Sequence, residues 1–169
     1  PGGAPAMTTP AMLLSDAGFS ADGAYRYWLS RQWDAAKPYM AACALNPSTA
    51  GKVENDPTVR RLIGYAVDWG FGGLKLTNIF SLRATDPSRL YDVPDPVGPL
   101  NDQAIVEHTR DVSIVLVAWG AHGALHGRGD AVMKLLRAHN RPVRCLKRTK
   151  DGAPGHVLYL AKNLKPVEC

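Results

Sequence analysis

The sequence has little of what marks disulfide-stabilised, metal-binding or membrane proteins. Its three cysteines, Cys43, Cys145 and Cys169, are odd in number, widely spaced and contain no Cys-x-x-Cys pair. They therefore indicate neither a disulfide framework nor a cysteine-ligated metal site. No apolar run approaches the roughly 20 residues that span a bilayer. We expect a cytoplasmic protein that has no membrane partner.

The common catalytic signatures are absent as well. The chain has no phosphate-loop motif, no Gly-x-Ser-x-Gly elbow and no cysteine paired with a histidine and a third orienting residue. Its histidines lack the paired spacing on one helix face, with a carboxylate, that a metal site requires. We expect no metal and no cofactor.

Length and charge narrow the class of protein. The 169 residues fit one α/β domain over residues 13–169, preceded by a flexible tail over residues 1–12. The tail lacks the basic and then apolar segments of a signal peptide. We expect this domain to be a monomer. The net charge of +5 fits a nucleic-acid or phosphate partner, because cationic surface attracts polyanions, although many basic proteins bind neither.

Hydrophobic patterning predicts strands that alternate with helices. Strands are expected at residues 24–33, 39–46, 73–80, 112–120 and 143–147, and helices at 56–70, 101–110 and 127–140. Residues 24–33 alternate apolar with polar side chains, which is typical of an antiparallel edge strand. The order predicts a three-layer α/β/α fold, with a mostly parallel central sheet of about four strands plus this N-terminal antiparallel edge strand.

Polar residues gather where the predicted strands end. In chain order these ends carry Asn46-Pro47-Ser48-Thr49, Thr77-Asn78, Trp119-Gly120 and, after the last strand, His156. Ligands of open parallel sheets bind outside the carboxyl ends of the strands. We therefore expect Asn46, Asn78 and His156 to converge on one pocket.

Each candidate also has a structural interpretation. Asn-Pro-Ser is a common turn sequence, and a lone histidine is often a surface or structural residue. An Asn that ends a buried strand costs desolvation unless its amide finds partners, so Asn78 is a candidate for ligand binding. The basic residues are candidates for phosphate contact or ordinary solvated charge; they are Arg60, Arg61, Arg83, Arg144, Lys147, Arg148 and Lys150.

Two family resemblances follow from these motifs. The segments LNPSTA, DPTVRRLIGYAVDWG, LTNIFSLRATDP and GHVLYL resemble a bacterial and phage family catalogued as a domain of unknown function, DUF1643, over about residues 24–162. The strand ends are also distantly similar to the uracil-DNA glycosylase superfamily, whose parallel sheet is flanked by helices. That similarity implies a uracil-DNA-glycosylase-like fold.

In that superfamily a first strand ends in a Gly-x-Asp-Pro or Gly-x-Asn-Pro turn, a later strand ends in an Asn that binds the base, and a His-Pro loop supplies a catalytic histidine. Asn46, Asn78 and His156 occupy the matching places. The chain departs from the pattern because it lacks the preceding glycine and the four-cysteine cluster, and has Val157 where the superfamily has Pro.

The similarity implies a DNA glycosylase-like protein that hydrolyses the N-glycosidic bond of a nucleobase, including a modified one, in DNA. His156 would donate a hydrogen bond to the leaving base, Asn78 would bind the Watson–Crick edge, and Asn46 would position the water, with Asp56 as the nearest base. Further contacts are expected from Pro47, Ser48, Thr49, Phe80 and Trp119 to the substrate, and from Arg60, Arg83 and Arg148 to phosphates.

Two other functions stay open. One is a nucleic-acid-binding protein without catalysis that retains the base pocket, and the other is an enzyme that acts on free nucleosides or nucleotides. Phe80 and Trp119 suit base stacking and a hydrophobic core equally well.

Overall fold

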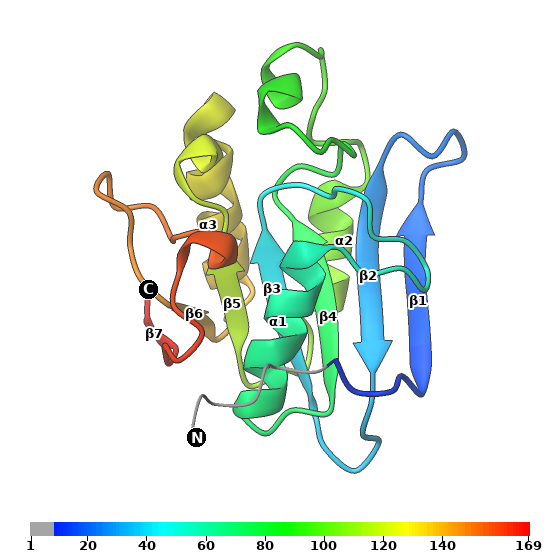
Figure 1. Ribbon diagram of the computed structural model, residues 1–169. Helices are drawn as coiled ribbons and strands as arrows, with labels where there is room; N and C mark the ends of the chain where they lie inside the picture. The colour runs from blue at the N-terminus through cyan, green and yellow to red at the C-terminus, as the bar shows by residue number, and fades with distance from the viewer. Residues whose placement is uncertain (1–8) are drawn as a thin grey trace.

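The structure, a computed structural model, describes residues 9–169. The first eight positions of the tail expected at residues 1–12 lie outside this range. The described chain forms one seven-stranded sheet in the order β1-β2-β4-β3-β5-β6-β7 (Figure 1).

The strands are β1 (Leu14–Phe19), β2 (Arg26–Gln32), β3 (Tyr39–Ala44), β4 (Gly73–Asn78), β5 (Val115–Ala118), β6 (Val143–Cys145) and β7 (Val167–Glu168). The α-helices are α1 (Pro57–Asp68), α2 (Asn101–His108) and α3 (Arg128–Ala138). Three short 3₁₀-helices lie in the loops: η1 (Pro87–Tyr91), η2 (Ala121–Gly127) and η3 (Val157–Tyr159).

The prediction of a mostly parallel sheet with about four strands and one antiparallel edge strand is wrong. The pairings of β3 with β4, β3 with β5 and β5 with β6 are parallel, whereas β1–β2, β2–β4 and β6–β7 are antiparallel. β2, expected at the edge, is covered by β1. The sheet is therefore mixed and differs from the uracil-DNA-glycosylase-like arrangement predicted from the sequence.

The two strands that sequence patterning missed have a common physical cause. β1 has the sequence LSDAGF and β7 has only two residues, so neither shows the hydrophobic alternation of a strand. Both are held by backbone pairing, β1 along β2 and β7 along β6. Strand formation that depends on a neighbour gives no local sequence signal.

The central strand β3 is buried on both faces. Met40, Ala42 and Ala44 belong to the core cluster beneath α1, while Ala41 and Cys43 belong to the cluster on the opposite face. This double burial explains the unbroken apolar run YMAACA, because both sets of alternating side chains meet protein.

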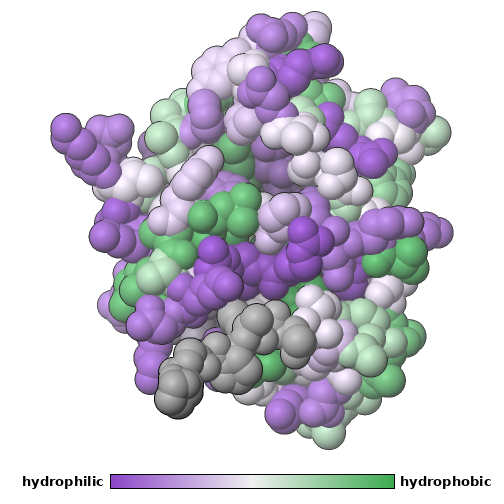
Figure 2. All heavy atoms as spheres, viewed as in Figure 1, coloured by the Kyte–Doolittle hydropathy of each residue, from purple (hydrophilic) through white to green (hydrophobic). Residues whose placement is uncertain are grey.

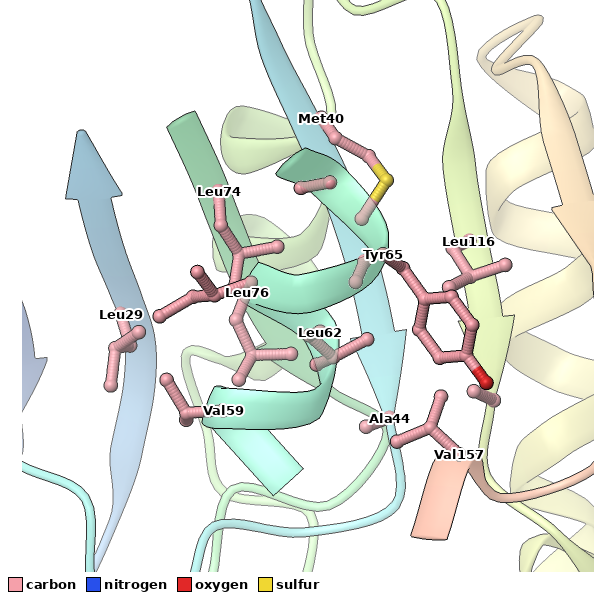
Figure 3. Close-up of a cluster of buried hydrophobic side chains, with 14 of the residues drawn as sticks. Leu29, Met40, Ala44, Val59, Leu62, Tyr65, Leu74, Leu76, Leu116 and Val157 are labelled. Atoms are coloured by element: carbon pink, nitrogen blue, oxygen red, sulfur yellow. The ribbon is translucent and has the colours of Figure 1, made fainter. Parts of the chain in front are cut away.

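Helices cover both faces of the sheet. On one face α1 packs Val59, Leu62 and Tyr65 against β2, β4 and β5, as Figure 3 shows. The other face carries α2 and α3 through Ile105 and Val132. Among residues 9–169, no helix has the length and apolar character needed to cross a membrane.

The chain path creates a crevice at the carboxyl edge of the parallel strands. From β3 the chain continues through α1 to β4 on one side, whereas from β5 it continues through α3 to β6 on the other side. The loops that leave β3 and β5 therefore diverge, which is the position where ligands bind in open α/β sheets.

Candidate functional site

A cavity of about 770 Å³ lies at this crevice, a volume in the range of small-molecule sites. Its wall is built by the loops after β3, β4, β5 and β6 and by the first turn of α1. The polar and aromatic residues that line it are Asn46, Ser48, Thr49, Asp56, Thr58, Thr85, Trp119, His122, Lys147, Arg148, Thr149, His156 and Tyr159.

Asn46 joins the loops that follow β3 and β4. Its side-chain amide donates hydrogen bonds to the carbonyl oxygens of Ala84 at 2.8 Å and Pro47 at 3.0 Å. The Ala84 N–H in turn donates to the Pro47 carbonyl at 2.9 Å. Within residues 9–169 no group donates to Asn46 Oδ1, so this oxygen is the atom that Asn46 offers to a ligand or water.

Asp56 is buried at the start of α1, where it acts as the helix cap. Its Oδ1 accepts the Val59 N–H at 2.9 Å and its Oδ2 accepts the Ala50 N–H at 3.2 Å. The residues DPT thus begin the helix as expected, with Pro57 at the first helical position. Asp56 is also the single carboxylate among the described residues that line the cavity.

Two buried arginines hold the loop between β3 and α1. Arg31, with an exposed fraction of 0%, donates to the carbonyl oxygens of Gly51, Lys52 and Glu54 at 2.7 to 3.0 Å. Arg26 donates to the Ala50 carbonyl at 3.1 Å. Burial lowers the pKa of Arg26 to about 10, so the guanidinium stays charged at neutral pH. These arginines set the shape of one cavity wall.

His156 reaches the cavity through a short hairpin after β6. The Gly155 N–H donates to the Lys147 carbonyl and the Gly120 N–H donates to the Pro154 carbonyl, both at 2.7 Å. Gly120 has a φ of 70°, a conformation that suits glycine. The hairpin therefore fixes the backbone just before His156 against the end of β5.

The hydrogen bonding of His156 identifies which ring nitrogen carries the proton. Nδ1 accepts the Leu158 N–H at 3.2 Å, so in the neutral ring the proton is on Nε2. Burial lowers the pKa of His156, and the nearby Asp56 opposes this shift. At neutral pH the imidazole is neutral and offers an Nε2–H donor.

Aromatic residues border the same cavity. Trp119 is almost fully buried, and Gly123 and Gly129 leave room for its indole, because a Cβ at either glycine would clash with the ring. Tyr159 is 86% exposed and its ring centroid lies 5.7 Å from that of His156. Tyr159 is therefore free to cover a bound ligand.

Of the three residues expected to converge, Asn46 and His156 line the cavity and Asn78 does not. Asn78 is 3% exposed; its Oδ1 accepts from Arg26 at 3.3 Å, and its carbonyl accepts from Asn101 at 2.8 Å. The side-chain oxygen thus finds its partner inside the protein, as buried polar groups do. In this structure Asn78 holds Arg26 instead of facing the cavity.

The other predicted residues are divided in the same way. Ser48, Thr49, Asp56, Trp119 and Arg148 line the cavity, whereas Pro47 supports it through the carbonyl that Asn46 and Ala84 bind.

Three predicted residues lie outside the cavity wall. Phe80 is fully buried in the core beside α2 and α3. Arg83 binds the Gly23 carbonyl at 3.2 Å and stacks over Phe19. Arg60 lies in an adjoining hollow on α1.

Sequence patterning missed several residues of the site. His122, Thr149 and Tyr159 lie in loops without hydrophobic periodicity, so only the fold brings them to the cavity. Arg26 and Arg31 alternate with apolar residues as solvent-facing side chains do, yet both are buried. The glycines in GAHGALHGRG were an available signal, since two of them make room for Trp119.

The charges at the cavity favour an anionic or polar ligand. Lys147 and Arg148 line it together with one carboxylate that already accepts two backbone hydrogen bonds. In the described part of the chain, no group of three or more His, Cys, Asp or Glu side chains is placed to hold a metal ion.

Comparison with known families gives one match. A family model described as "Protein of unknown function (DUF1643)" matches residues 26–158, and the chain therefore belongs to this family. No curated protein and no solved structure is matched by the chain.

Proposed function

We propose that this DUF1643 chain recognises a nucleobase in DNA and hydrolyses its N-glycosidic bond. The observation that carries the proposal is the state of His156, a neutral imidazole whose Nδ1 accepts the Leu158 N–H and whose Nε2–H is available in the cavity. The distant similarity of the ALNPS and GHVLYL segments to uracil-DNA glycosylases supports the same chemistry.

In this reaction the bond between the base nitrogen and the sugar C1′ breaks, and its electron pair leaves with the base. Negative charge develops on the base while positive charge develops on the sugar. A preorganised donor near a base oxygen stabilises this charge, and such donors contribute about 10² to 10³ in rate. His156 Nε2–H is the donor in our proposal.

Water completes the reaction at C1′. Its oxygen forms the new bond to the sugar, one proton goes to a base on the protein, and a proton finally reaches the released nucleobase. Asn46 Oδ1 orients the water, because an amide accepts a hydrogen bond but not the proton itself. Asp56, the carboxylate in the cavity wall, receives the proton.

Tyr159 and Trp119 contact the base in this proposal. Every base presents a π-face, and stacking on an aromatic ring contributes about 1 to 3 kcal/mol. Ser48, Thr49 and Thr149 supply hydroxyl groups to the base edge. Asn78 and Phe80 have no part in it, because their side chains are engaged inside the protein.

The activity is tested by incubating the protein with duplex and single-stranded oligonucleotides that carry different natural and modified bases, and with the matching free nucleosides and nucleotides. Mass spectrometry then detects released base. Release from one class of oligonucleotide supports the proposal, whereas release from free nucleotides alone assigns the protein to the nucleotide-hydrolysing enzymes.

A nucleic-acid-binding protein without catalysis is the second candidate. It is favoured by the bonding of Asp56, whose two oxygens each accept a backbone N–H and so already have a structural role at the start of α1. Binding of base-bearing oligonucleotides with no release of base across the whole panel would select this candidate.

A further inference from the structure

A second, smaller hollow adjoins the main cavity on the side of α1. It has a volume of about 290 Å³ and shares Pro57 and Leu158 with the main cavity, so the two lie side by side. Three cationic side chains line it, namely Arg60, Arg61 and Lys162. We call this group of three residues the basic hollow.

The fold brings these cations together from two distant parts of the chain. Arg60 and Arg61 lie in the first half of α1, and Tyr65 lies one turn further on. The Tyr65 hydroxyl donates to the Ala161 carbonyl at 2.7 Å, which holds the C-terminal segment against the helix. Lys162, the next residue, is thereby placed beside the two arginines. Figure 2 shows hydrophilic side chains gathered over this face of the molecule.

No acidic side chain balances the basic hollow. Its lining contains no carboxylate within the described residues. The ion pairs found between residues 9 and 169 are Lys37 with Asp34 and Arg128 with Asp102, so none involves these three cations. Arg60 uses one guanidinium nitrogen to bind the Asn55 carbonyl at 2.9 Å, which fixes its direction and leaves its other donors available.

Like charges held close together repel one another unless an anion lies between them. Arginine binds phosphate with two parallel hydrogen bonds, and lysine adds a point charge. A nucleotide carries a phosphate within a few bonds of its base, so a base in the main cavity brings its own phosphate to the adjoining hollow.

We propose that the basic hollow is the phosphate subsite of the ligand whose base occupies the main cavity. This inference rests on the proposed function in that it takes the ligand to be a nucleobase bearing a sugar and a phosphate. Arg61 and Lys162 are assigned here as its principal phosphate ligands, with Arg60 as the third. The protein therefore prefers a phosphorylated ligand to the corresponding nucleoside.

The test compares the wild type with the double variant Arg61→Gln, Lys162→Gln. A control variant carries Arg110→Gln and Lys165→Gln, which remove the same charges at exposed positions outside the cavities. Calorimetry measures the affinity for 2′-deoxyuridine, for its 5′-monophosphate and for a short single-stranded oligonucleotide. Thermal melts verify that each variant is folded.

We expect the double variant to bind the monophosphate and the oligonucleotide about tenfold more weakly, as the loss of charge-assisted hydrogen bonds implies, and to bind the nucleoside as the wild type does. The control should keep the wild-type affinities. For the oligonucleotide, the slope of log K against log salt should fall by roughly 0.7 for each lost contact. If the double variant binds the monophosphate more weakly but shows the wild-type salt slope for the oligonucleotide, the phosphate bound in the hollow belongs to a free nucleotide.

Equal affinity of the double variant and the wild type for both phosphorylated ligands, or no binding of either by the wild type, overturns the subsite. The result is independent of catalysis. If the double variant binds phosphorylated ligands more weakly and the wild type releases no base, the subsite is retained and hydrolysis is rejected. If the wild type releases base and the double variant binds phosphorylated ligands normally, hydrolysis is retained and the subsite is rejected.

Discussion

At the scale of single residues, the site depends on polar groups whose partners are fixed by the fold. His156 shows this most clearly, because one backbone hydrogen bond to Nδ1 and partial burial together set its tautomer and its charge. Arg31 shows the same principle in the loop after β3, where one guanidinium satisfies several backbone carbonyls that would otherwise be buried without a donor.

The lowered pKa of His156 predicts a loss of stability in acid. The unfolded chain, with an ordinary histidine pKa of about 6.5, takes up a proton before the folded protein does, so the free energy of unfolding falls as the pH drops below about 6.5. His156→Asn keeps an acceptor for the Leu158 N–H but does not titrate.

The difference in unfolding free energy between about pH 7 and pH 5.5 should therefore be smaller in His156→Asn than in the wild type, as measured by urea denaturation. Some dependence remains, because burial also lowers the pKa of His108. An identical difference in the two proteins would show that His156 titrates with an ordinary pKa.

The buried arginine gives a prediction for stability. Arg31→Met removes the donors to Gly51, Lys52 and Glu54 and leaves buried carbonyls unpaired, so we expect a loss of about 3 kcal/mol in the free energy of unfolding. Arg110→Met, at an exposed position in the turn after α2, is the matched control and should change it by less than about 0.5 kcal/mol. Chemical denaturation measures both, and equal effects would refute the role assigned to Arg31.

Asn78 gives a prediction that separates structure from ligand binding. Asn78→Ala removes the oxygen that Arg26 binds, and Arg26 Nε already has no partner in the described structure. We expect a loss of about 1 to 3 kcal/mol in stability and an unchanged preference among bases in the oligonucleotide panel. A folded variant with altered base preference would instead place Asn78 in contact with the substrate.

At the scale of elements, the sequence predicts the parts of the fold that have local signals. The buried run of β3, the helix start at Asp56-Pro57 and the apolar run of β5 follow from periodicity and capping. β1 and β7 do not, because only their pairing with β2 and β6 defines them. HVLYL, apolar enough for a strand, forms the 3₁₀-helix η3, since the His156 ring accepts the Leu158 N–H.

The residues of the candidate site likewise divide into those with a local sequence signal and those without one. Asn46 and Trp119 were predictable because they closely follow β3 and β5, and His156 was predicted from its place after the last expected strand, although the hairpin that brings it to the cavity was not. His122 and Tyr159 were not, since their positions depend on how η2 and η3 fold over the sheet edge. Asn78 ends its strand as expected, but the neighbouring antiparallel strand β2 supplies Arg26 as its partner. The sequence predicted this antiparallel strand at the sheet edge, but not that it lies beside β4.

The start of α1 carries an element-scale prediction, because Asp56 both caps the helix and lines the cavity. Asp56→Asn accepts only one of the two backbone N–H groups with its single oxygen and cannot take a proton from water. We expect turnover to fall by about 10² to 10⁴ and stability by about 1 kcal/mol, measured by single-turnover kinetics and thermal melts. Wild-type turnover in the folded variant would remove Asp56 from the chemistry and leave it as a helix cap.

At the scale of the whole molecule, charge connects the fold to its proposed ligand. The chain has 20 Lys and Arg side chains and 15 Asp and Glu side chains, a net charge of +5. The two ion pairs found in residues 9–169 leave most of these cations without a carboxylate partner. Lys147 and Arg148 lie at the main cavity, and the basic hollow lies beside it.

This arrangement of cationic side chains predicts that affinity for DNA decreases steeply with salt, because bound counterions are released when DNA binds. Affinity that stays constant from low to moderate salt would contradict a DNA ligand.

The central claim, that His156 donates to a leaving nucleobase, is tested most directly by steady-state kinetics of His156→Ala on the best substrate of the oligonucleotide panel. His139→Ala, an exposed histidine at the end of α3, serves as the control. Because the donor acts where charge develops in the transition state, kcat should fall by about 10² to 10³ while KM stays nearly constant. Full turnover by folded His156→Ala would contradict the account.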